Sequence, residues 1–227
     1  MKKFTNGLFI TGTDTEVGKT FITQCVIRKL TKDGKRVAGL KPIASGAEWI
    51  EAQWQNEDAL ALQQASNVEL SYQEINPFCF EPAIAPHIAA EQANQMLSVI
   101  SLQEALAAPK ADVTVIEGAG GWLTPLNQHE TYADWVSLNQ LPVILVVGMK
   151  LGCLNHAMLT VESIKSRGLS FVGWVANFSQ KEMVVAEQNL EWLNANIQAP
   201  CLGVIPYQPS TNDLSGVEAL LDLQVLL

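Results

Sequence analysis

Short runs of consecutive apolar residues recur along the chain and are separated by segments with helical spacing. Five of these runs predict β-strands, and a sixth at residues 201–205 is a weaker candidate; the five cover residues 8–11, 36–40, 113–116, 143–147 and 171–176. Runs that are apolar at every position are typical of strands buried on both faces, as in a parallel sheet covered by helices.

Three segments carry the helical spacing, at residues 20–31, 155–167 and 182–196. The first ends before Asp33-Gly34 and the second before Gly168, and such residues commonly end helices. The alternation of strand and helix predicts an α/β fold, with a doubly wound, mainly parallel sheet flanked by helices.

Residues 47–91 are the least regular part of the chain, because Pro77, Pro82 and Pro86 interrupt any periodic pattern. We expect loops and short helices there. The sequence has no internal repeat and no Gly/Ser-rich linker, and its 227 residues suit one domain. We therefore expect a single domain over residues 1–227.

The composition is that of a globular protein with an acidic surface. Hydrophobic residues make up 48% and charged residues 16%, which is the reverse of a disordered chain. The formal net charge of -9 repels nucleic-acid phosphates, so we expect no nucleic-acid partner. A local loop can still bind the phosphates of a nucleotide inside an acidic protein.

The cysteines and histidines carry no metal-binding pattern. They are scattered, without a Cys-x-x-Cys pair: Cys25, Cys79, Cys153, Cys201, His87, His129 and His156. Zinc sites need clustered ligands, so we interpret the cysteines as the reduced thiols of a cytoplasmic protein.

No segment predicts a membrane protein. The N-terminal apolar run is too short for a signal peptide. The most apolar stretch, residues 141–149, is far shorter than the roughly 20 residues that cross a bilayer. We expect a cytoplasmic protein without a membrane partner.

Residues 12–20, GTDTEVGKT, lie between the first predicted strand and the first predicted helix. In this setting backbone N–H groups and the helix N-terminus cradle phosphate, Lys19 can reach the β- and γ-phosphates, and the Thr20 hydroxyl can bind Mg²⁺. The spacing is unusual, because five residues instead of four separate Gly12 from Gly18. The alternative is a glycine turn with an exposed lysine, which the strand–loop–helix order disfavours.

Glu117 begins a second glycine-rich motif, EGAGG, directly after the predicted strand 113–116. Ligands bind open α/β sheets at the carboxyl ends of the strands. We therefore expect this carboxylate on the same edge as the phosphate loop, where it can bind Mg²⁺ directly or through water. The alternative is a turn with a solvated carboxylate.

Lys41 begins the motif KPIASG, directly after the predicted strand 36–40. Most such lysines are solvated, but a second cation near a transferring phosphate would stabilise the developing negative charge. Asp58 opens a helical stretch, and an acid in the first turn of a helix needs no metal to explain it.

The segment LGCLNH, residues 151–156, follows the strand 143–147 and starts a helix. A helix N-terminus can bind a carboxylate, or the segment can be a simple strand-to-helix turn. His156 is more often structural than catalytic. Asn177 ends the strand 171–176, where it can hydrogen-bond a base edge or cap a turn.

Taken together, these motifs resemble those of the dethiobiotin synthase family. GTDTEVGKT, with its displaced first glycine, and KPIASG are similar to that family's phosphate loop and second signature. The blocks VIEGAGGWLTPL, YADW, LPVILVVGMKLGCLNHAMLT and GWVAN follow in the family's order, so the resemblance covers residues 7–207. The resemblance implies the P-loop NTPase fold.

The resemblance also implies an activity, that of an ATP-dependent cyclo-ligase in biotin biosynthesis. The family's substrates are 7,8-diaminopelargonate, CO₂ and ATP, used with Mg²⁺, and its products are dethiobiotin, ADP and phosphate. One amine takes up CO₂ as a carbamate, whose oxygen attacks the γ-phosphate and forms a mixed carbamic-phosphoric anhydride. The second amine then closes the ring and expels phosphate. Such chemistry needs positioning and charge neutralisation more than a protein nucleophile.

The resemblance assigns site residues position by position. Lys41 matches the catalytic lysine, and Lys19 and Thr15 match residues around the phosphates and the carbamate. The implied Mg²⁺ ligands are Thr20, Asp58 and Glu117. The implied nucleotide contacts are Glu16, Val17, Gly18, Lys19, Thr20, Phe21, Asp58, Glu117, Gly118, Ala119, Gly120, Asn177, Phe178, Pro206, Tyr207, Gln208 and Asp213.

Asn177 would read the adenine, and two departures from the family pattern lie near this adenine pocket. Phe178 stands where a polar residue is expected, and residues 206–213 match only at their start. The implied substrate contacts are Ser45 and a loop of five residues, Leu151, Gly152, Cys153, Leu154 and Asn155. In this family the loop comes from the other subunit, which implies a homodimer with the substrate site at its interface.

Three alternatives stay open. A nucleotide-dependent switch of the partitioning-ATPase type carries an extra lysine five positions before the main one, where this chain has Asp14. A synthase for a different small amine or acid would share the fold. A relative that binds nucleotide without turnover is disfavoured by the intact Lys19, Thr20, Lys41 and Glu117.

Overall fold

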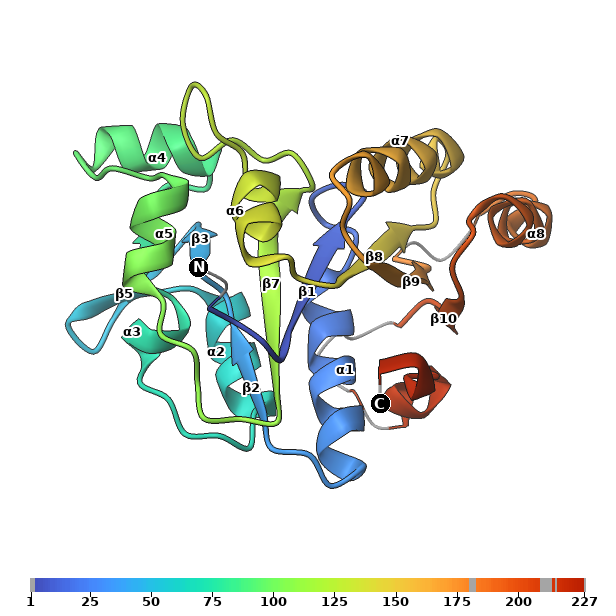
Figure 1. Cartoon of the computed structure of the whole chain (residues 1–227), viewed down its shortest axis with the longest axis horizontal. Coiled ribbons are helices and arrows are strands. Elements are labelled where there is room, and N and C mark those ends of the chain that lie inside the picture. Colours follow the sequence, from blue (N-terminus) through green and yellow to red (C-terminus); the bar gives the residue numbers. More distant parts are fainter. Residues whose placement is uncertain (1–2, 180–182, 209–213, 215, 227) are drawn as a thin grey trace.

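Six parallel strands run through the middle of the molecule, between layers of helices (Figure 1). The computed structural model describes residues 3–179, 183–208, 214 and 216–226. The strands lie in the order β10-β9-β8-β1-β7-β2, with bounds β1 Gly7–Gly12, β2 Val37–Leu40, β7 Val113–Gly121, β8 Val143–Gly148, β9 Phe171–Asn177 and β10 Cys201–Ile205. Every neighbouring pair is parallel. The chain adds strands on both sides of β1, with β7 and β2 on one side and β8, β9 and β10 on the other. The predicted doubly wound α/β fold is therefore confirmed.

All six predicted strands are present, including the weaker candidate, which forms β10. The prediction for β7 was wrong at its end. The strand continues through Gly121, because Glu117 pairs with Ile10 and Gly121 pairs with Gly12 of the neighbouring β1. The EGAGG motif is therefore the end of a strand rather than a turn that follows one.

The three predicted helices are α1 Lys19–Lys32, α7 Cys153–Ser166 and α8 Ala186–Asn196. Two starting points differ from the prediction. Gly152 caps α7 with a left-handed φ of 92°, so this helix begins two residues before the expected position 155. Val185 precedes α8 with a φ of 54°, so α8 begins at Ala186 rather than at 182.

The irregular part of the chain contains more order than the sequence indicated. The predicted short helices are present, but three short strands of residues 47–91 were missed. The additional elements along the chain are β3 Ile43–Ser45, β4 Glu48–Ile50, β5 Gln53–Gln55, α2 Glu57–Ala65, α3 Tyr72–Ile75, β6 Phe78–Phe80, α4 Pro86–Gln92, α5 Val99–Ala105, α6 Tyr132–Asn139 and the 3-10 turns η1 Val217–Leu220 and η2 Gln224–Leu226. β3 pairs with β6 in parallel, and β4 with β5 in an antiparallel hairpin.

The apolar strands are buried on both faces, as their composition predicts. Phe9 of β1 packs on one face, where its ring centroid lies 5.3 Å from that of Tyr132 in α6. Its neighbour Ile10 packs on the other face with residues of α1 such as Ile22. Because burying one such side chain stabilises the fold by about 1.5–3 kcal/mol, the two cores hold the helices against the sheet.

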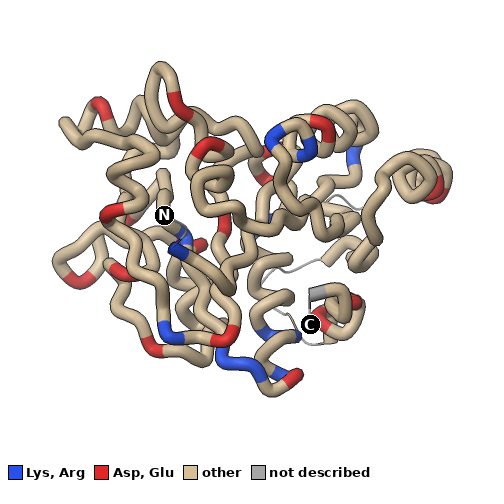
Figure 2. Tube along the Cα trace, viewed as in Figure 1, with Lys and Arg blue, Asp and Glu red and all other residues tan. Residues whose placement is uncertain are grey.

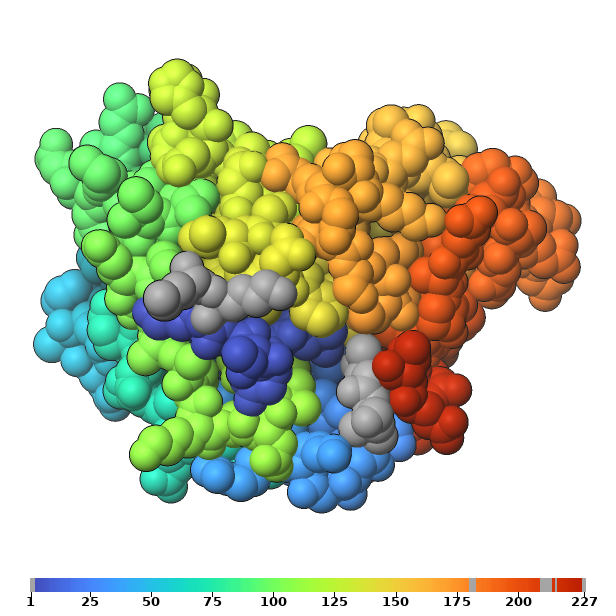
Figure 3. All heavy atoms as spheres, in the orientation of Figure 1, coloured from blue at the N-terminus to red at the C-terminus, as the bar shows by residue number. Residues whose placement is uncertain are grey.

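The chain's last described segment lies at the surface of the molecule (Figure 3), and its 3-10 turn η1 contacts α1, the helix that follows the phosphate loop. Glu218 of η1 accepts a hydrogen bond from Lys32 at the end of α1. This contact connects the C-terminal part of the chain to α1.

Charged residues are spread along the fold, with acidic residues in many of its elements (Figure 2). Among the described residues, no helix is both long enough and apolar enough to cross a membrane.

Candidate active site

The phosphate loop connects β1 to α1 at the carboxyl edge of the sheet. Gly18 caps α1 with a φ of 83°, a conformation that favours glycine. A Cβ atom at Gly18 would also lie 2.2 Å from Nδ2 of Asn177. That Nδ2 atom donates to the carbonyl oxygen of Val17 over 2.8 Å. The end of β9 is thereby fastened to the phosphate loop.

The displaced glycine has a packing reason. A Cβ atom at Gly12 would lie 2.6 Å from the buried side chain of Val17 and 3.0 Å from that of Lys19. The loop therefore folds back over the end of β1, which leaves no room for a side chain at position 12. The predicted contacts Thr15 and Glu16 lie exposed on the outside of this loop, whereas Phe21 is buried in α1.

Lys19 points into the loop, where its Nζ atom donates to the carbonyl oxygen of Asp14 over 3.0 Å. The side chain is buried. Burial and the nearby Lys41 ammonium lower the pKa of Lys19 to about 8. An ammonium in this environment gains from any phosphate oxygen that reaches the loop.

Lys41 lies between two carboxylates. Its Nζ atom donates to Oε1 of Glu117 over 2.5 Å and to Oδ2 of Asp58 over 2.9 Å. Burial lowers the pKa of Lys41, but Glu117 and Asp58 together raise it above its ordinary value, so the side chain stays protonated. Burial raises the pKa of Asp58, but the Lys41 ammonium outweighs that effect and holds the pKa of Asp58 below its ordinary value.

The three proposed metal ligands meet at this cluster. The hydroxyl of Thr20 donates to Oε1 of Glu117 over 2.8 Å, and Asp58 approaches from the start of α2. Glu117 is fully buried, and its Oε2 atom has no hydrogen-bond partner among the described residues. Such an orphaned carboxylate oxygen beside a hydroxyl and a second carboxylate fits Mg²⁺, which prefers oxygen ligands.

The donor set is small, and this also fits Mg²⁺. The described part of the chain contains no group of three or more His, Cys, Asp or Glu side chains placed to hold a metal ion. Mg²⁺ usually relies on one or two carboxylates together with substrate phosphates and water, rather than on an all-protein cage.

The N-terminus of α7 lies beside the phosphate loop. Lys150, just before the predicted substrate loop, forms an ion pair with Asp14, with 2.9 Å between Nζ and Oδ2. Leu151 is 100% exposed, and Gly152 has free space where a Cβ atom would stand. Cys153 is buried and Leu154 is half-buried, so the exposed residues of the loop are Leu151, Gly152 and Asn155.

Ser45 ends β3, four residues after Lys41. Its Oγ atom is shielded from solvent and has no partner among the described residues. An unpaired hydroxyl of this kind can accept or donate a hydrogen bond to a substrate.

The predicted base contacts lie at the carboxyl ends of β9 and β10. The backbone N–H of Phe178 donates to the carbonyl oxygen of Ile205 over 3.0 Å, which places Pro206, Tyr207 and Gln208 next to the end of β9. Gly118, Ala119 and Gly120 lie in β7. Asp213 lies outside the described residues.

Sequence reasoning missed two groups of residues at this edge. Lys150 lies in the block LPVILVVGMKLGCLNHAMLT, and the sequence analysis gave it no role. Its charge is opposite to that of Asp14, which was the only sign in the sequence that the two side chains pair. Tyr72 and Asn76 belong to a buried hydrogen-bond network behind Lys41. The Asn-Pro pair at 76–77 marks a turn, but nothing in the local sequence connects it to position 41.

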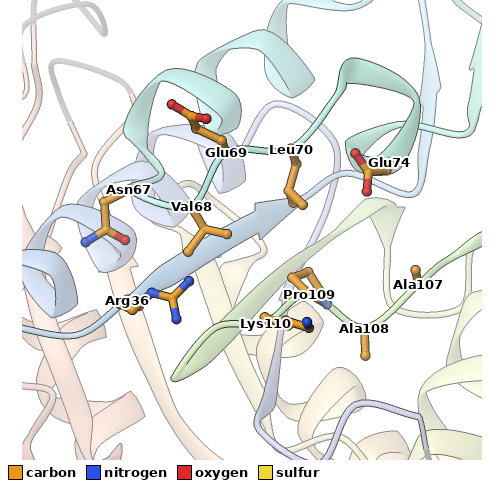
Figure 4. Close-up of a pocket in the computed structure, with 10 residues that line it drawn as sticks. All are labelled: Arg36, Asn67, Val68, Glu69, Leu70, Glu74, Ala107, Ala108, Pro109 and Lys110. Atoms are coloured by element: carbon orange, nitrogen blue, oxygen red, sulfur yellow. The ribbon is translucent and has the colours of Figure 1, made fainter.

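A surface groove lies at the other end of the sheet (Figure 4). It has a volume of about 520 Å³, and Arg36 and Lys110 line it where β2 and β7 are about to begin. Ligands of open α/β sheets bind at the carboxyl ends of the strands, so this groove is separate from the site.

The family model described as an AAA domain matches residues 6–215 of the chain. Among curated proteins, the ATP-dependent dethiobiotin synthetase BioD of Cellvibrio japonicus is 48% identical over 221 residues, which is 96% of this chain and 96% of that protein. The protein of the same name from Aromatoleum aromaticum is 44% identical, over 88% of this chain and 89% of its own length. That of Yersinia pestis bv. Antiqua is 47% identical, over 88% and 84%.

Solved structures support the fold. The septum site-determining protein MinD of Pyrococcus horikoshii, complexed with Mg-ADP, has a TM-score of 0.55 and 17% identity. The alignment covers 89% of this chain and 82% of MinD. At this identity the likeness concerns the P-loop NTPase fold alone.

Proposed function

Because the chain belongs to the ATP-dependent dethiobiotin synthetase family, we infer that it closes the ureido ring of dethiobiotin from 7,8-diaminopelargonate and CO₂ at the cost of ATP. It is accordingly an ATP-dependent cyclo-ligase of biotin biosynthesis. The observation that supports this site best is the buried Lys41 ammonium between Glu117 and Asp58, beside the phosphate loop. The reaction moves negative charge at this place, and the Lys41 ammonium supplies a positive charge beside it.

The nucleotide phosphates bind in the loop at residues 12–20. Its backbone N–H groups, the N-terminus of α1 and the Lys19 ammonium all favour anions. Bound phosphate would replace the carbonyl oxygen of Asp14 as the acceptor for Lys19. Thr20, Asp58 and Glu117 would hold Mg²⁺, which neutralises phosphate charge when it is bound.

Lys41 serves the phosphoryl transfer itself. A carbamate oxygen attacks the γ-phosphate, ADP leaves, and the resulting mixed anhydride loses phosphate when the second amine attacks the carbonyl carbon. Each step places charge on oxygen atoms rather than on a protein nucleophile. Lys41 and Lys19, both buried, can donate hydrogen bonds to those oxygens, and burial strengthens such bonds.

The diaminopelargonate is held at two places. The unpaired Ser45 hydroxyl and Thr15 are proposed to contact its reacting end, and the N-terminus of α7 its carboxylate. We assign the loop Leu151, Gly152, Cys153, Leu154 and Asn155 to this second role across a homodimer interface. The full exposure of Leu151, together with the exposed Leu159 on the same helix, supports a partner at this surface.

The adenine is proposed to lie at the ends of β9 and β10, beside Asn177, Phe178 and Pro206. Asn177 already touches the phosphate loop through Val17, so a base at this position lies close to the phosphates. A cytoplasmic location is part of the proposal, because all four cysteines are free thiols, which persist in a reducing compartment.

The decisive experiment incubates the purified protein with diaminopelargonate, bicarbonate, Mg²⁺ and ATP, and follows both phosphate release and dethiobiotin formation by mass spectrometry. We expect both products in equal amounts. A monoamine analogue of the substrate is the control, because it offers no second amine and should give no ring. Phosphate release no higher than in the substrate-free sample would reject the proposed function.

The switch-type alternative makes a different prediction. A partitioning ATPase would hydrolyse ATP without diaminopelargonate and would use a lysine where this chain has Asp14. Asp14 instead pairs with Lys150 of the same chain. Steady ATP hydrolysis without the substrate would favour that alternative.

A further inference from the structure

We propose that Asn76, supported by Tyr72, is a positioning residue for Lys41. A closed ring of hydrogen bonds through these side chains fixes the backbone of Lys41 relative to Asp58. The inference rests on the proposed catalytic role of Lys41, although the ring itself is a feature of the structure alone.

The end of α3 holds both polar backbone groups of Lys41. The N–H group of Lys41 donates to the carbonyl oxygen of Ile75 over 3.0 Å. Its own carbonyl oxygen accepts from Nδ2 of Asn76 over 2.6 Å. Lys41 directly follows the last residue of β2, so its backbone groups bond to the α3 segment instead of to a neighbouring strand.

Tyr72 sets the direction in which the Asn76 amide points. Its hydroxyl accepts a hydrogen bond from the backbone N–H of Asn56 over 2.8 Å. The hydroxyl proton is then free to go to Oδ1 of Asn76, 2.7 Å away. With Oδ1 used as an acceptor, the Nδ2 donor faces the carbonyl oxygen of Lys41.

Asn56 connects the network back to the lysine side chain. It is the N-cap of α2, where its side chain accepts from the backbone N–H of Asp58 over 3.1 Å. The carboxylate of Asp58 accepts from Nζ of Lys41, which closes the ring. The same Asn56 amide lies 3.3 Å from the carbonyl oxygen of Ser45, so the ring also touches the proposed substrate contact.

Two prolines restrict the backbone where the ring is anchored. Lys41 precedes Pro42 and Asn76 precedes Pro77, and a residue before proline is held in an extended conformation. The two Pro-containing segments lie side by side, since the N–H of Phe78 donates to the carbonyl oxygen of Pro42 over 3.2 Å. Restricting both anchors leaves Lys41 few alternative positions.

Four residues of the ring are buried, so water cannot replace the bonds among them, whereas the side chain of the fifth, Asp58, is 35% exposed. Asn56, Tyr72, Asn76 and Lys41 are each almost inaccessible to solvent. A misplaced catalytic group costs turnover even when binding is unchanged, by about 100-fold for a displacement of 1 Å. A network with a purely structural role would instead change stability and leave the turnover of the folded enzyme intact.

Asn139 offers a matched control for the difference between these roles. It is equally buried, in α6, and its amide makes comparable bonds to the carbonyl oxygen of Trp135 and to Gln103. Its hydrogen bonds within the described part of the chain go to Lys3, Gln103 and Trp135, and none joins it to Lys41. Asn76→Asp and Asn139→Asp therefore remove the same type of amide donor, and only the donor of Asn76 bonds to Lys41.

We would measure kcat, the KM for ATP and the melting temperature of Asn76→Asp, Tyr72→Phe and Asn139→Asp in the complete enzyme. The expected result for Asn76→Asp is a fall in kcat of about tenfold or more, with the KM for ATP changed less than about threefold. Tyr72→Phe should fall in the same direction by a smaller factor. Asn139→Asp should lose stability to a similar extent and keep its kcat.

Equal kcat values for Asn76→Asp and Asn139→Asp would overturn the inference. If Asn76→Asp does not fold, Tyr72→Phe decides instead, and a wild-type kcat for Tyr72→Phe would overturn the inference. A crystal structure of Asn76→Asp separates this inference from the proposed function. Movement of Lys41 Nζ away from Asp58 in that structure supports the positioning role, whatever the substrate of the enzyme is. A wild-type enzyme that is inactive with diaminopelargonate rejects the proposed function and leaves the positioning role standing. An unmoved lysine overturns the positioning role.

Discussion

The ammonium of Lys41 and the fully buried carboxylate of Glu117 lie 2.5 Å apart, and Asp58 shares the same ammonium. The cation thus stands among the carboxylates that are proposed to hold Mg²⁺. Either side chain alone would be a buried charge, which is costly, so each residue depends on the other.

Lys41→Ala should lower kcat by about 100- to 1,000-fold, because one positive charge is lost where negative charge develops. ATP affinity should change little, since Lys19 and the loop backbone remain. Isothermal titration calorimetry and the phosphate-release assay measure the two effects. Lys110→Ala, which removes an exposed lysine at the far end of the sheet, should behave like wild type. A nearly wild-type rate for Lys41→Ala would reject its catalytic role.

Glu117→Gln should destabilise the fold by about 3 kcal/mol, because it leaves the Lys41 ammonium buried with Asp58 as its remaining partner. The double variant Lys41→Met/Glu117→Gln should be more stable than Glu117→Gln, since the buried ammonium that lost one of its two carboxylate partners is gone. Urea denaturation of the wild type, both single variants and the double variant measures this coupling. Additive losses would mean that the two side chains do not stabilise each other.

Gly18→Ala should reduce both stability and ATP affinity. The new methyl group would meet Asn177, 2.2 Å away, in a backbone conformation that already disfavours alanine. Gly152→Ala is the matched control, because its φ of 92° is also left-handed but, apart from its chain neighbours, no atom of the described residues lies within 4 Å of the added carbon. Gly152→Ala should cost about 1 kcal/mol from strain alone. If both variants lose the same stability, the contact with Asn177 is unimportant.

The contact between η1 and α1 should depend on pH. The hydrogen bond from Lys32 holds the pKa of Glu218 below its usual range. The other ionisable groups near Glu218 are Arg28 and Cys25, and burial raises the pKa of this thiol to about 12, so it stays neutral. The folded pKa is below the unfolded one, so the stabilisation is present above the unfolded pKa and is lost as the pH falls through the folded value.

Chemical denaturation of wild type and Glu218→Gln across the acid range tests this expectation. The wild type should be the more stable protein near neutral pH, and its advantage should shrink as the pH falls below about 4.3. Asp33→Asn, which breaks an exposed i,i+4 pair with Lys29, should give a smaller difference. A stability advantage independent of pH would show that the charge of Glu218 contributes nothing.

Two inactive variants should restore activity when they form mixed dimers. Lys41→Ala removes the proposed catalytic lysine, and Asn155→Glu places a negative charge where the substrate carboxylate is proposed to bind. If one site uses Lys41 of one subunit and the loop of the other, a mixed dimer has one intact site. Random mixing should then recover about a quarter of wild-type activity. No recovery in co-expressed, purified mixed dimers would place the complete site within one chain.

The sequence predicted the parts of this fold that depend on local patterns. Continuous apolar runs identified the parallel sheet, and GTDTEVGKT identified the phosphate loop, because both signals lie within a few consecutive residues. The extension of β7 through Gly121 was missed, because it depends on pairing with Gly12, which is distant in sequence. A glycine-rich stretch has no apolar side chains from which a strand could be recognised.

The contacts within the site show the same limit. Glu117 was expected at the sheet edge because it follows a predicted strand, whereas Asp58 and the catalytic role of Lys41 were assigned through the family resemblance. Each residue alone had an ordinary explanation. Their convergence is a property of the sheet edge, where residues 17 and 76 positions apart meet. The Asn76 ring was invisible for the same reason, since its bonds join three separate segments, at residues 41, 56–58 and 72–76.

The hydrogen bond from Asn177 to Val17 affects how much conformational entropy the enzyme loses when a nucleotide binds. One side chain joins the proposed base pocket to the phosphate loop, so both halves of the nucleotide site are aligned before any ligand arrives. A pocket that is already assembled loses little freedom on binding, and more of the contact energy remains as affinity. In the proposed site, Asn177 would thereby act as a spacer that fixes the separation between base and phosphates that a ligand must match.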